Sequence, residues 1–286
     1  MSTKPIQQPG SGRTFRFGRI RPIARGPRLR LSNYLMRTLP TPPPTCDYRR
    51  AAASALAKTY RNMDLNDCVI AGLAHLVGVL TGNAGTKPFL YSDRQIVTLY
   101  SAIGGYVPGK KDTDNGCDEQ TALNYWENNG FPKGSNHKIA GWLAVNGNDP
   151  VEYKTALWLF ENLFFGVEMP DEWVHPPVTK SGFEWDIAGA PNKDNGHCFP
   201  GVGYNDKGVI IATWGLTGLI TDAAINKYAT IAAQGDLYTV ISHDAINTAT
   251  QKAPNGFDWS QLTADFDSMG GSVSNSSPLG GKQRRK

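Results

Sequence analysis

Apolar residues at helical spacing dominate the first half of the chain. Over residues 68–81 they recur three and four positions apart and form a broad apolar face, which predicts a buried helix. A second helix is predicted over residues 92–104, from a serine N-cap to a glycine pair. A third is predicted over residues 117–128, where Asn-Asn-Gly stops it. The alanine-rich stretch at 48–60 also favours a helix.

The second half of the chain begins with alternating strand and helix patterns. Residues 138–145 alternate between apolar and polar side chains, which predicts a strand, and residues 164–169 predict another. Between them, Asp149-Pro150 provides a cap and a first turn for a helix that runs through Leu163. Residues 170–195 are rich in proline and glycine and are expected to form a long surface loop.

The most regular β pattern comes next. Residues 197–204 and 209–214 flank a polar turn at 205–208, which predicts a hairpin. A helix over 223–233 and a strand over 237–241 are expected to follow. Helices first and an antiparallel sheet second predict an α+β fold.

Composition divides the chain into three parts. We expect residues 1–45 to form a basic arm rich in Pro and Arg, and residues 46–260 to form the α+β domain. Residues 261–286 are predicted to be a flexible basic tail rich in Gly and Ser. Near the end of the domain, Phe257-Asp258-Trp259 is expected to anchor an otherwise polar stretch to the body.

Charge is distributed very unevenly along the chain. Residues 1–50 hold eleven Lys and Arg against one acidic residue, a net charge of +10, and the last five residues add +4. Because the whole chain has a net charge of +4, the body between these ends carries −10. We expect the arm to dock on an acidic surface of its own body, of a neighbouring subunit or of a partner. Its arginines, with Phe15 and Phe17 among them, also suit phosphates, so nucleic acid is an alternative partner.

Other features argue against several classes of protein. No run of about 18 apolar residues predicts a membrane span, and no secretory signal is visible at the N-terminus. Four scattered cysteines do not make a disulfide framework, which favours a reducing compartment. A metal site at Cys68, His197 and Cys198 is not expected, since neighbours in a strand point to opposite faces. No cofactor is expected either, and the carboxylates of residues 112–119 are typical of a solvated loop.

A cysteine and a histidine carry the candidate chemistry. A polar loop leads directly into Cys68 at the start of the predicted buried helix, where unpaired backbone N–H groups and the helix dipole stabilise a thiolate. His197 begins a predicted strand 129 residues later. A thiol attacks amide and ester carbonyls well once an imidazole accepts its proton, so the pair predicts a Cys–His dyad. His75 lies two turns deeper on the same helix and is expected to be a core residue.

The order of these residues resembles the papain-like cysteine peptidase superfamily. The resemblance rests on Cys68, on Gly-His-Cys-Phe-Pro-Gly-Val-Gly-Tyr at 196–204 and on Ile-Ala-Thr-Trp-Gly at 211–215. It is nearest to a group of uncharacterised bacterial and tailed-phage proteins, in which an Arg/Pro-rich leader ends in Leu-Pro-x-Pro-Pro before an Asn-Asp-x-x-x-Asp-Cys loop. This chain has Leu39-Pro40-Thr41-Pro42-Pro43 and the loop 62–68 at these places.

The resemblance implies a papain-like fold and assigns roles to single residues. The nucleophile falls on Cys68 and the base on His197. An oxyanion-hole donor falls on Asn62, six positions before the nucleophile, and the backbone N–H of Cys68 would be the second donor. Trp214 forms a wall of the site.

One position departs from the superfamily pattern. The asparagine that orients the histidine falls on Ala212, which has no polar side chain. Thr213 is next to it, but strand alternation is expected to point its side chain to the opposite face. Candidates for the orienting role are Thr213 or Asp206, with Asp194 or a backbone carbonyl as further options.

Two functions follow as hypotheses. The first is a cysteine hydrolase, a peptidase or amidase, that acts on a protein or peptide through Cys68 and His197. The second is a weak or inactive papain-like module that serves as a structural or interaction protein, for example a phage virion component docked through its basic arms. In that case Cys68 is only a small buried hydrophobic residue. The expected location is the bacterial host cytoplasm or the virion, without membrane association.

Overall fold

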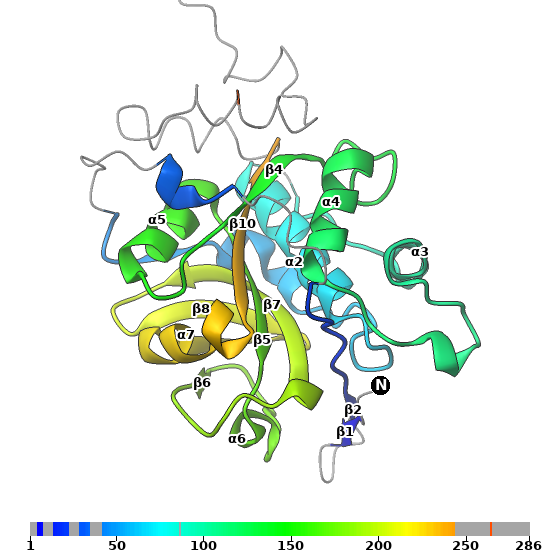
Figure 1. The fold of residues 1–286 in the computed structure, drawn as a ribbon. Coiled ribbons are helices and arrows are strands. Elements are labelled where there is room, and N and C mark those ends of the chain that lie inside the picture. Colours follow the sequence, from blue (N-terminus) through cyan, green and yellow to red (C-terminus); the bar gives the residue numbers. More distant parts are fainter. Residues whose placement is uncertain are drawn as a thin grey trace, which may run out of the picture.

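The computed structural model describes residues 5–7, 14–22, 29–34, 42–85 and 87–243, together with Ala264. Its centre is a large sheet with helices on both faces (Figure 1). Most helices come from the first half of the chain and most strands from the second half, as the α+β prediction required. None of the described helices has the length and apolar character that a membrane crossing needs.

The sheet has eight strands in the order β4-β10-β5-β7-β8-β9-β6, and β3 pairs with β7 off this path. The β6–β9 pair is parallel, and the other pairs are antiparallel. The strands are β3 (Cys46–Asp47), β4 (Ile139–Ala144), β5 (Leu163–Glu168), β6 (Phe183–Trp185), β7 (Gly196–Tyr204), β8 (Gly208–Thr213), β9 (Leu216–Thr221) and β10 (Asp236–Ser242).

The helices begin and end largely where their caps predict. A capping box at Ser92 and a left-handed Gly105 bound α3, while Asp118 caps α4 and Asp149 caps α5. The α-helices are α1 (Arg49–Leu56), α2 (Cys68–Asn83), α3 (Asp93–Gly104), α4 (Glu119–Asn129), α5 (Pro150–Phe160), α6 (Asp171–Val174) and α7 (Asp222–Tyr228). Short 3-10 turns are η1 (Leu31–Asn33), η2 (Lys111–Thr113), η3 (Lys193–Asn195) and η4 (Ile231–Ala233).

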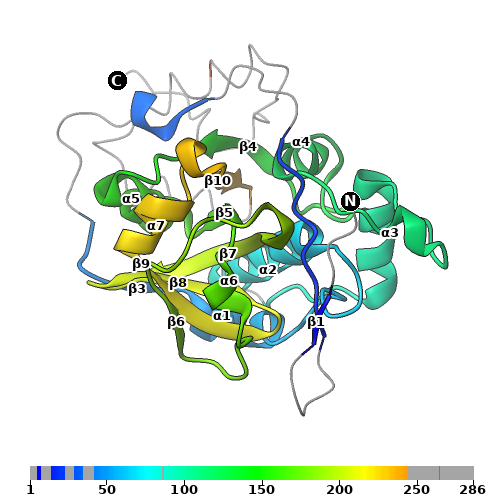
Figure 2. The same cartoon turned by 60° about the horizontal axis from the view of Figure 1, so that its bottom comes forward.

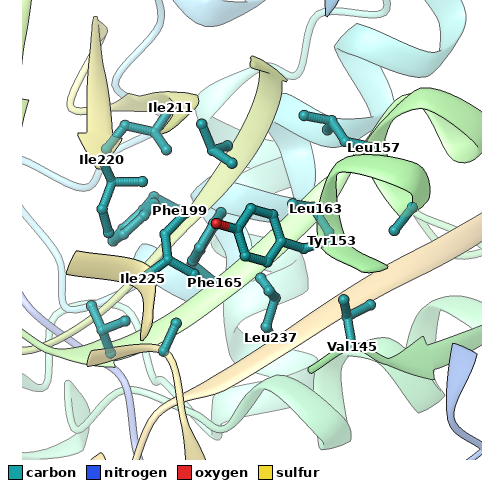
Figure 3. Packing of buried hydrophobic residues seen from close by; sticks show 14 of the residues in the cluster. Val145, Tyr153, Leu157, Leu163, Phe165, Phe199, Ile211, Ile220, Ile225 and Leu237 are labelled. Atoms are coloured by element: carbon teal, nitrogen blue, oxygen red, sulfur yellow. The ribbon is translucent and has the colours of Figure 1, made fainter. Parts of the chain in front are cut away.

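Strand alternation sends side chains into different hydrophobic clusters on the two faces of the sheet. On β5 and β7, Phe164 and Cys198 face α2, whereas Phe165 and Phe199 face the cluster that includes α5 and α7 (Figure 3). Gly72 on α2 permits the close approach, since a Cβ there would lie 2.7 Å from the Phe164 ring. The sheet therefore has a buried helix on one face and a second hydrophobic core on the other.

Several predicted boundaries were wrong. Helix α5 ends at Phe160 because Glu161 adopts a left-handed conformation, so Leu163 belongs to β5. The expected surface loop at 170–195 holds α6 and β6 and buries two tryptophans in a stacked pair. Strand β9 was not predicted, and the helix expected over 223–233 is the shorter α7 followed by η4.

The N-terminal segment at residues 14–22 packs against the body. In both views it runs along the boundary between α3 and α4 on one side and the sheet on the other (Figures 1 and 2). Its strand β2 (Thr14–Phe15) pairs with β1 (Ile6–Gln7), and Phe15, Phe17 and Arg19 are buried. Docking on the acidic body was one of the arrangements expected for this arm. The predicted anchor at 257–259 and the tail at 261–286, except Ala264, lie outside the described residues.

Replacing Phe165 by Ala is expected to lower the free energy of unfolding by about 3–5 kcal/mol. The ring is fully buried and stacks on Phe199 with centroids 5.2 Å apart, so its loss leaves a cavity. Urea unfolding followed by tryptophan fluorescence measures the change. Ile231→Ala is the control because that side chain is 56% exposed, and its effect should stay within about 0.5 kcal/mol. Equal effects of the two substitutions would contradict this account of the core.

Candidate active site

Cys68 is the first residue of α2, directly after the polar loop, and it is only 1% exposed. The loop is held by Asn66, whose backbone N–H and side-chain amide donate to the carboxylate and the carbonyl of Asp114 at 2.9 and 2.7 Å. Asp114 is therefore a buried structural residue and does not belong to a solvated loop, and Glu119 is also buried. These contacts fix the start of the helix and the position of the thiol.

His75 has the structural environment expected of a core residue. Its Nε2 lies 2.9 Å from the carbonyl oxygen of Lys58, and the ring is 2% exposed. Burial lowers the pKa of His75 to about 4, although the bond to Lys58 opposes this shift. The ring is therefore neutral at physiological pH, and its Nε2 is hydrogen-bonded to a backbone carbonyl.

His197 is the second residue of β7 and is fully buried. Its Nε2 lies 2.7 Å from the hydroxyl of Thr213, the last residue of β8. The indole of Trp214 stacks on the imidazole, with centroids 4.4 Å apart and planes 17° apart. The other ring nitrogen, Nδ1, is buried and makes no hydrogen bond to a nitrogen or oxygen of the described residues. The Thr213 bond and the Trp214 stack together fix the ring plane.

Thr213 faces His197 because the pairing of β7 with β8 changes register. Near the turn, Tyr204 pairs with Val209. If this register continued along the two strands, Thr213 would lie on the face of the sheet opposite to His197. The register shifts by one residue between Gly201 and Gly203. Beyond the shift Gly201 pairs with Ile211, so Thr213 shares the face of His197. The expectation that alternation points Thr213 away was therefore wrong, because it assumed unbroken pairing.

The other candidate orienting residues lie elsewhere. Asp206 is exposed in the hairpin loop beyond the far end of β7, and Asp194 is exposed in η3. Trp214 and Gly215 form a two-residue turn between β8 and β9, with φ of 52° and 76°. Positive φ at both positions is typical of a type I′ hairpin turn, and it holds the Trp214 ring against the histidine.

The thiol of Cys68 interacts with His197 and with the neighbouring Cys198. Burial alone would raise the pKa of the Cys68 thiol, but the neighbouring side chains of Cys198 and His197 lower it well below its ordinary range. Because Nε2 is taken by Thr213, Nδ1 is the ring nitrogen available to the sulfur. The structure thus brings together Cys68, His197, Thr213 and Trp214.

Asn62 is buried in the loop before α2, near the thiol in sequence. Its amide nitrogen donates to the carbonyl oxygen of Leu65 at 3.3 Å. Asp67 is fully buried beside it, and burial, with the nearby Cys68, raises the pKa of this carboxyl well above its usual value.

The N-terminal segment lies across this site. The backbone N–H groups of Gly18 and Arg19 donate to the carbonyl of Gly196, the residue before His197, at 3.2 and 3.1 Å. On the other side, Cys117 donates to Gly18 at 2.9 Å and accepts from Ile20 at 3.0 Å. The segment therefore bridges β7 and the loop before α4.

Two residues of the segment close the site itself. The Phe17 ring packs edge-on against His197, with centroids 5.8 Å apart, and against Trp214 at 6.1 Å. Gly18 passes so close to the cysteine loop that a Cβ there would lie 1.7 Å from the carbonyl oxygen of Asn66. The segment therefore covers His197 and passes beside the loop that leads into Cys68. The alternation of Phe and Arg at positions 15–19 was visible in the sequence, but the partner surface was not.

Comparison with known proteins identifies the fold. The sequence matches no family model and no curated protein. Among solved structures, xylellain, a cysteine protease from Xylella fastidiosa, is 17% identical with a TM-score of 0.55, over 84% of this chain and 99% of xylellain. The fold is papain-like.

Two further papain-like structures give the same result. Digestive procathepsin L2 from Tenebrio molitor is 12% identical with a TM-score of 0.53, over 79% of this chain and 78% of that protein. The cysteine protease and lectin-like domains of Cwp84 from Clostridium difficile are 13% identical with a TM-score of 0.53, over 83% of this chain and 60% of that one. At such low identities the likeness establishes the fold and leaves the activity to be argued from the site.

Replacing Gly18 by Ala is expected to uncover Cys68. Its Cβ would clash with the backbone of Asn66, and overpacking of about 1–3 kcal/mol raises the uncovered population roughly 5- to 150-fold. The measurement is the iodoacetamide rate at Cys68, read by peptide mass spectrometry, with the partly exposed Cys46 as an internal standard.

Ile20→Ala is the matched control for Gly18→Ala, because that side chain in the same segment is 40% exposed. It should leave the alkylation rate of Cys68 within about twofold, as expected for a surface substitution. A Cys68 that reacts equally slowly in the Gly18→Ala protein and the wild type would show that the segment does not control access.

Proposed function

We propose that this protein is a papain-like cysteine hydrolase that cleaves peptide or other amide bonds. The observation that carries the proposal is the ordered arrangement of thiol, imidazole and hydroxyl. Nε2 of His197 is held by Thr213 at 2.7 Å, and the neighbouring Cys198 and His197 lower the pKa of the Cys68 thiol. Such an arrangement activates the Cys68 thiol as a nucleophile.

The chemistry assigned to each group follows from its position. The sulfur of Cys68 attacks the amide carbonyl carbon, and the carbonyl becomes an oxyanion. The backbone N–H of Cys68 at the start of α2, and the amide of Asn62 if it turns from Leu65, are the candidate donors to that oxyanion. His197 then protonates the departing amine, which leaves a thioester on Cys68. Water, deprotonated by the same imidazole, hydrolyses the thioester.

In this proposal Thr213 takes the positioning role that the superfamily assigns to an asparagine. Its hydroxyl oxygen accepts a hydrogen bond from the Nε2–H of the imidazolium, while Trp214 shields that bond from water. A neutral hydroxyl stabilises the positive ring less than a carboxylate would, so its main effect is on ring orientation.

A second candidate function has its own supporting observation. Cys68 is 1% and His197 0% exposed, and the N-terminal segment packs over His197 and beside the loop before Cys68. A papain-like module with a permanently covered dyad would serve as a structural or interaction protein, such as a virion component. Hydrolysis that depends on Cys68 in the Gly18→Ala protein would exclude this alternative. A Cys68 that stays unreactive in that protein, with no hydrolysis, would support it.

The pH profile of Cys68 alkylation tests the dyad. Because the pKa of the Cys68 thiol is lowered, the thiolate persists as the pH falls below the ordinary pKa of a cysteine. Reactivity is lost only when the pH falls below the lowered pKa. In His197→Ala the contribution of the imidazole is lost while that of Cys198 remains, so the titration of the Cys68 thiol moves upward. The relative iodoacetamide rate between pH 5 and pH 10 measures both curves. A thiol that titrates as an ordinary cysteine in both proteins would contradict the dyad.

Replacing Thr213 by Val is expected to lower kcat for a fluorogenic peptide amide by about threefold to tenfold, the cost of one hydrogen bond. Valine keeps the shape of the side chain and removes the hydroxyl. Thr213→Ser restores the hydroxyl and should recover most of the activity, whereas a purely structural role would be served by valine. A valine variant as active as the wild type would remove Thr213 from the proposal, and Cys68→Ala provides the background rate.

A further inference from the structure

The side chain of Arg19 fills an acidic pocket next to the dyad. Its Nε donates to Glu119 on α4, its Nη2 to Asp236 on β10 at 2.9 Å, and its Nη1 to the carbonyl of Gln234 at 3.0 Å. The Arg19 and Glu119 side chains are 1% and 0% exposed, and that of Asp236 is 11% exposed. All three guanidinium nitrogens are therefore bound by separate acceptors, which is the geometry that distinguishes arginine from lysine.

The pocket and the dyad share their walls. Gly196, which accepts a hydrogen bond from the Arg19 backbone, directly precedes His197. Cys198, which interacts with the Cys68 thiol, also contributes to the electrostatic environment of Arg19. Gly166 on β5 opens the pocket, since a Cβ there would lie 1.6 Å from Oε1 of Glu119 and 2.5 Å from Nε of Arg19. A side chain in the pocket thus lies beside the reacting groups.

The main chain of the segment is bound without regard to its sequence. The bonds of Gly18, Arg19 and Ile20 to Gly196 and Cys117 use backbone atoms only. Any extended peptide can offer the same donors and acceptors, and side-chain pockets then supply the selectivity. The segment therefore illustrates how the cleft holds a peptide, and Arg19 marks the side chain that its pocket accepts.

From these contacts we infer that the Glu119–Asp236 pocket is a specificity site for an arginine side chain of the peptide substrate. The inference rests on the proposed hydrolase function. Glu119 also has a second carboxylate oxygen, Oε2, that is buried and lacks a hydrogen-bond partner among the described residues. A pocket with two carboxylates and an unused acceptor strongly disfavours a neutral side chain, because the carboxylates would stay buried and unpaired.

A second arginine of the segment extends the pattern. The Arg21 guanidinium pairs with Glu168, in a surface pocket that Asp171 and Glu172 also line. Its side chain is 47% exposed, so this contact is far weaker than that of Arg19. The cleft therefore binds one arginine side chain in a buried pocket and favours a second cationic residue two positions further along the peptide.

Peptide cleavage by the full-length Gly18→Ala protein tests the inference. The substrates are internally quenched Gly/Ala peptides with a single arginine at successive positions, matched with peptides that carry citrulline, its neutral isostere, or lysine. At one position relative to the cleaved bond, kcat/KM for arginine should exceed that for citrulline by about tenfold to a hundredfold, the value of charged hydrogen bonds. Lysine should fall between them. Hydrolysis without any preference for arginine would overturn the inference and leave the hydrolase function intact.

Variants of the pocket assign the preference to its residues. In Glu119→Gln and in Asp236→Asn the arginine-to-citrulline ratio should fall several-fold, whereas Glu184→Gln, an exposed carboxylate on β6, should leave the ratio unchanged. The ratio is compared within each protein, so a general loss of activity does not affect it. An arginine-to-citrulline ratio that is unchanged in both pocket variants would show that other residues determine the preference.

Binding provides a readout that does not need hydrolysis. In full-length Arg19→Ala the pocket is empty, and Nα-acetyl-arginine amide should raise Tm at millimolar concentration, while Nα-acetyl-citrulline amide should not. If this variant does not fold, the full-length Gly18→Ala protein, in which the segment leaves the pocket more often, takes its place. Stabilisation by the arginine compound without peptide cleavage would retain the arginine site and reject the hydrolase. Equal effects of the two compounds would reject the arginine site.

Discussion

The shift of register between Gly201 and Gly203 determines how the candidate site is assembled. Strand β7 lies between β5 and β8, presents Cys198 toward α2 and carries His197 as its second residue. One extra residue in the β7–β8 pairing moves Thr213 to the face of the histidine and Ala212 to the opposite face, where it packs in a separate apolar cluster. Without the shift, the imidazole would face an alanine methyl group. A local irregularity in strand pairing thus supplies the polar partner of the ring.

The N-terminal segment connects the two halves of the site. Its backbone bonds to Gly196 on the sheet and to Cys117 beside α4, and Arg19 adds contacts to α4 and to β10. Burial of Phe17 against His197 removes water from the imidazole. The same contacts that order the site also close it. Stability of the closed form and reactivity of the thiol are therefore opposed, as strained or covered functional sites generally are.

Sequence patterns predicted the elements that carry the dyad, because α2 has a long apolar period and the β7–β8 hairpin has regular strands around a polar turn. They also placed Cys68 and His197 at element starts, and the structure brings the two together. They could not predict Thr213 as the partner of the ring, since a bulge leaves the side-chain pattern of each strand unchanged and alters only the pairing. The roles of Glu119 and Arg19 were also hidden, because a buried ion pair between distant segments resembles surface charge until both segments are placed.

The walls around the segment are built for a peptide backbone. Gly116 has φ of 83°, and a Cβ on it would lie 2.0 Å from the carbonyl oxygen of Gly18, while a Cβ on Gly196 would lie 2.7 Å from that of Arg19. A cleft that fits one extended chain so closely also fits another. The backbone contacts that hold the segment over the site are therefore the contacts that would hold a peptide. A tethered occupant acts at an effective concentration on the order of millimolar, well above most free peptides. In the proposed hydrolase, turnover therefore requires the segment to leave, and a substrate that also pairs with Glu119 and Asp236 is expected to compete best for the vacated site.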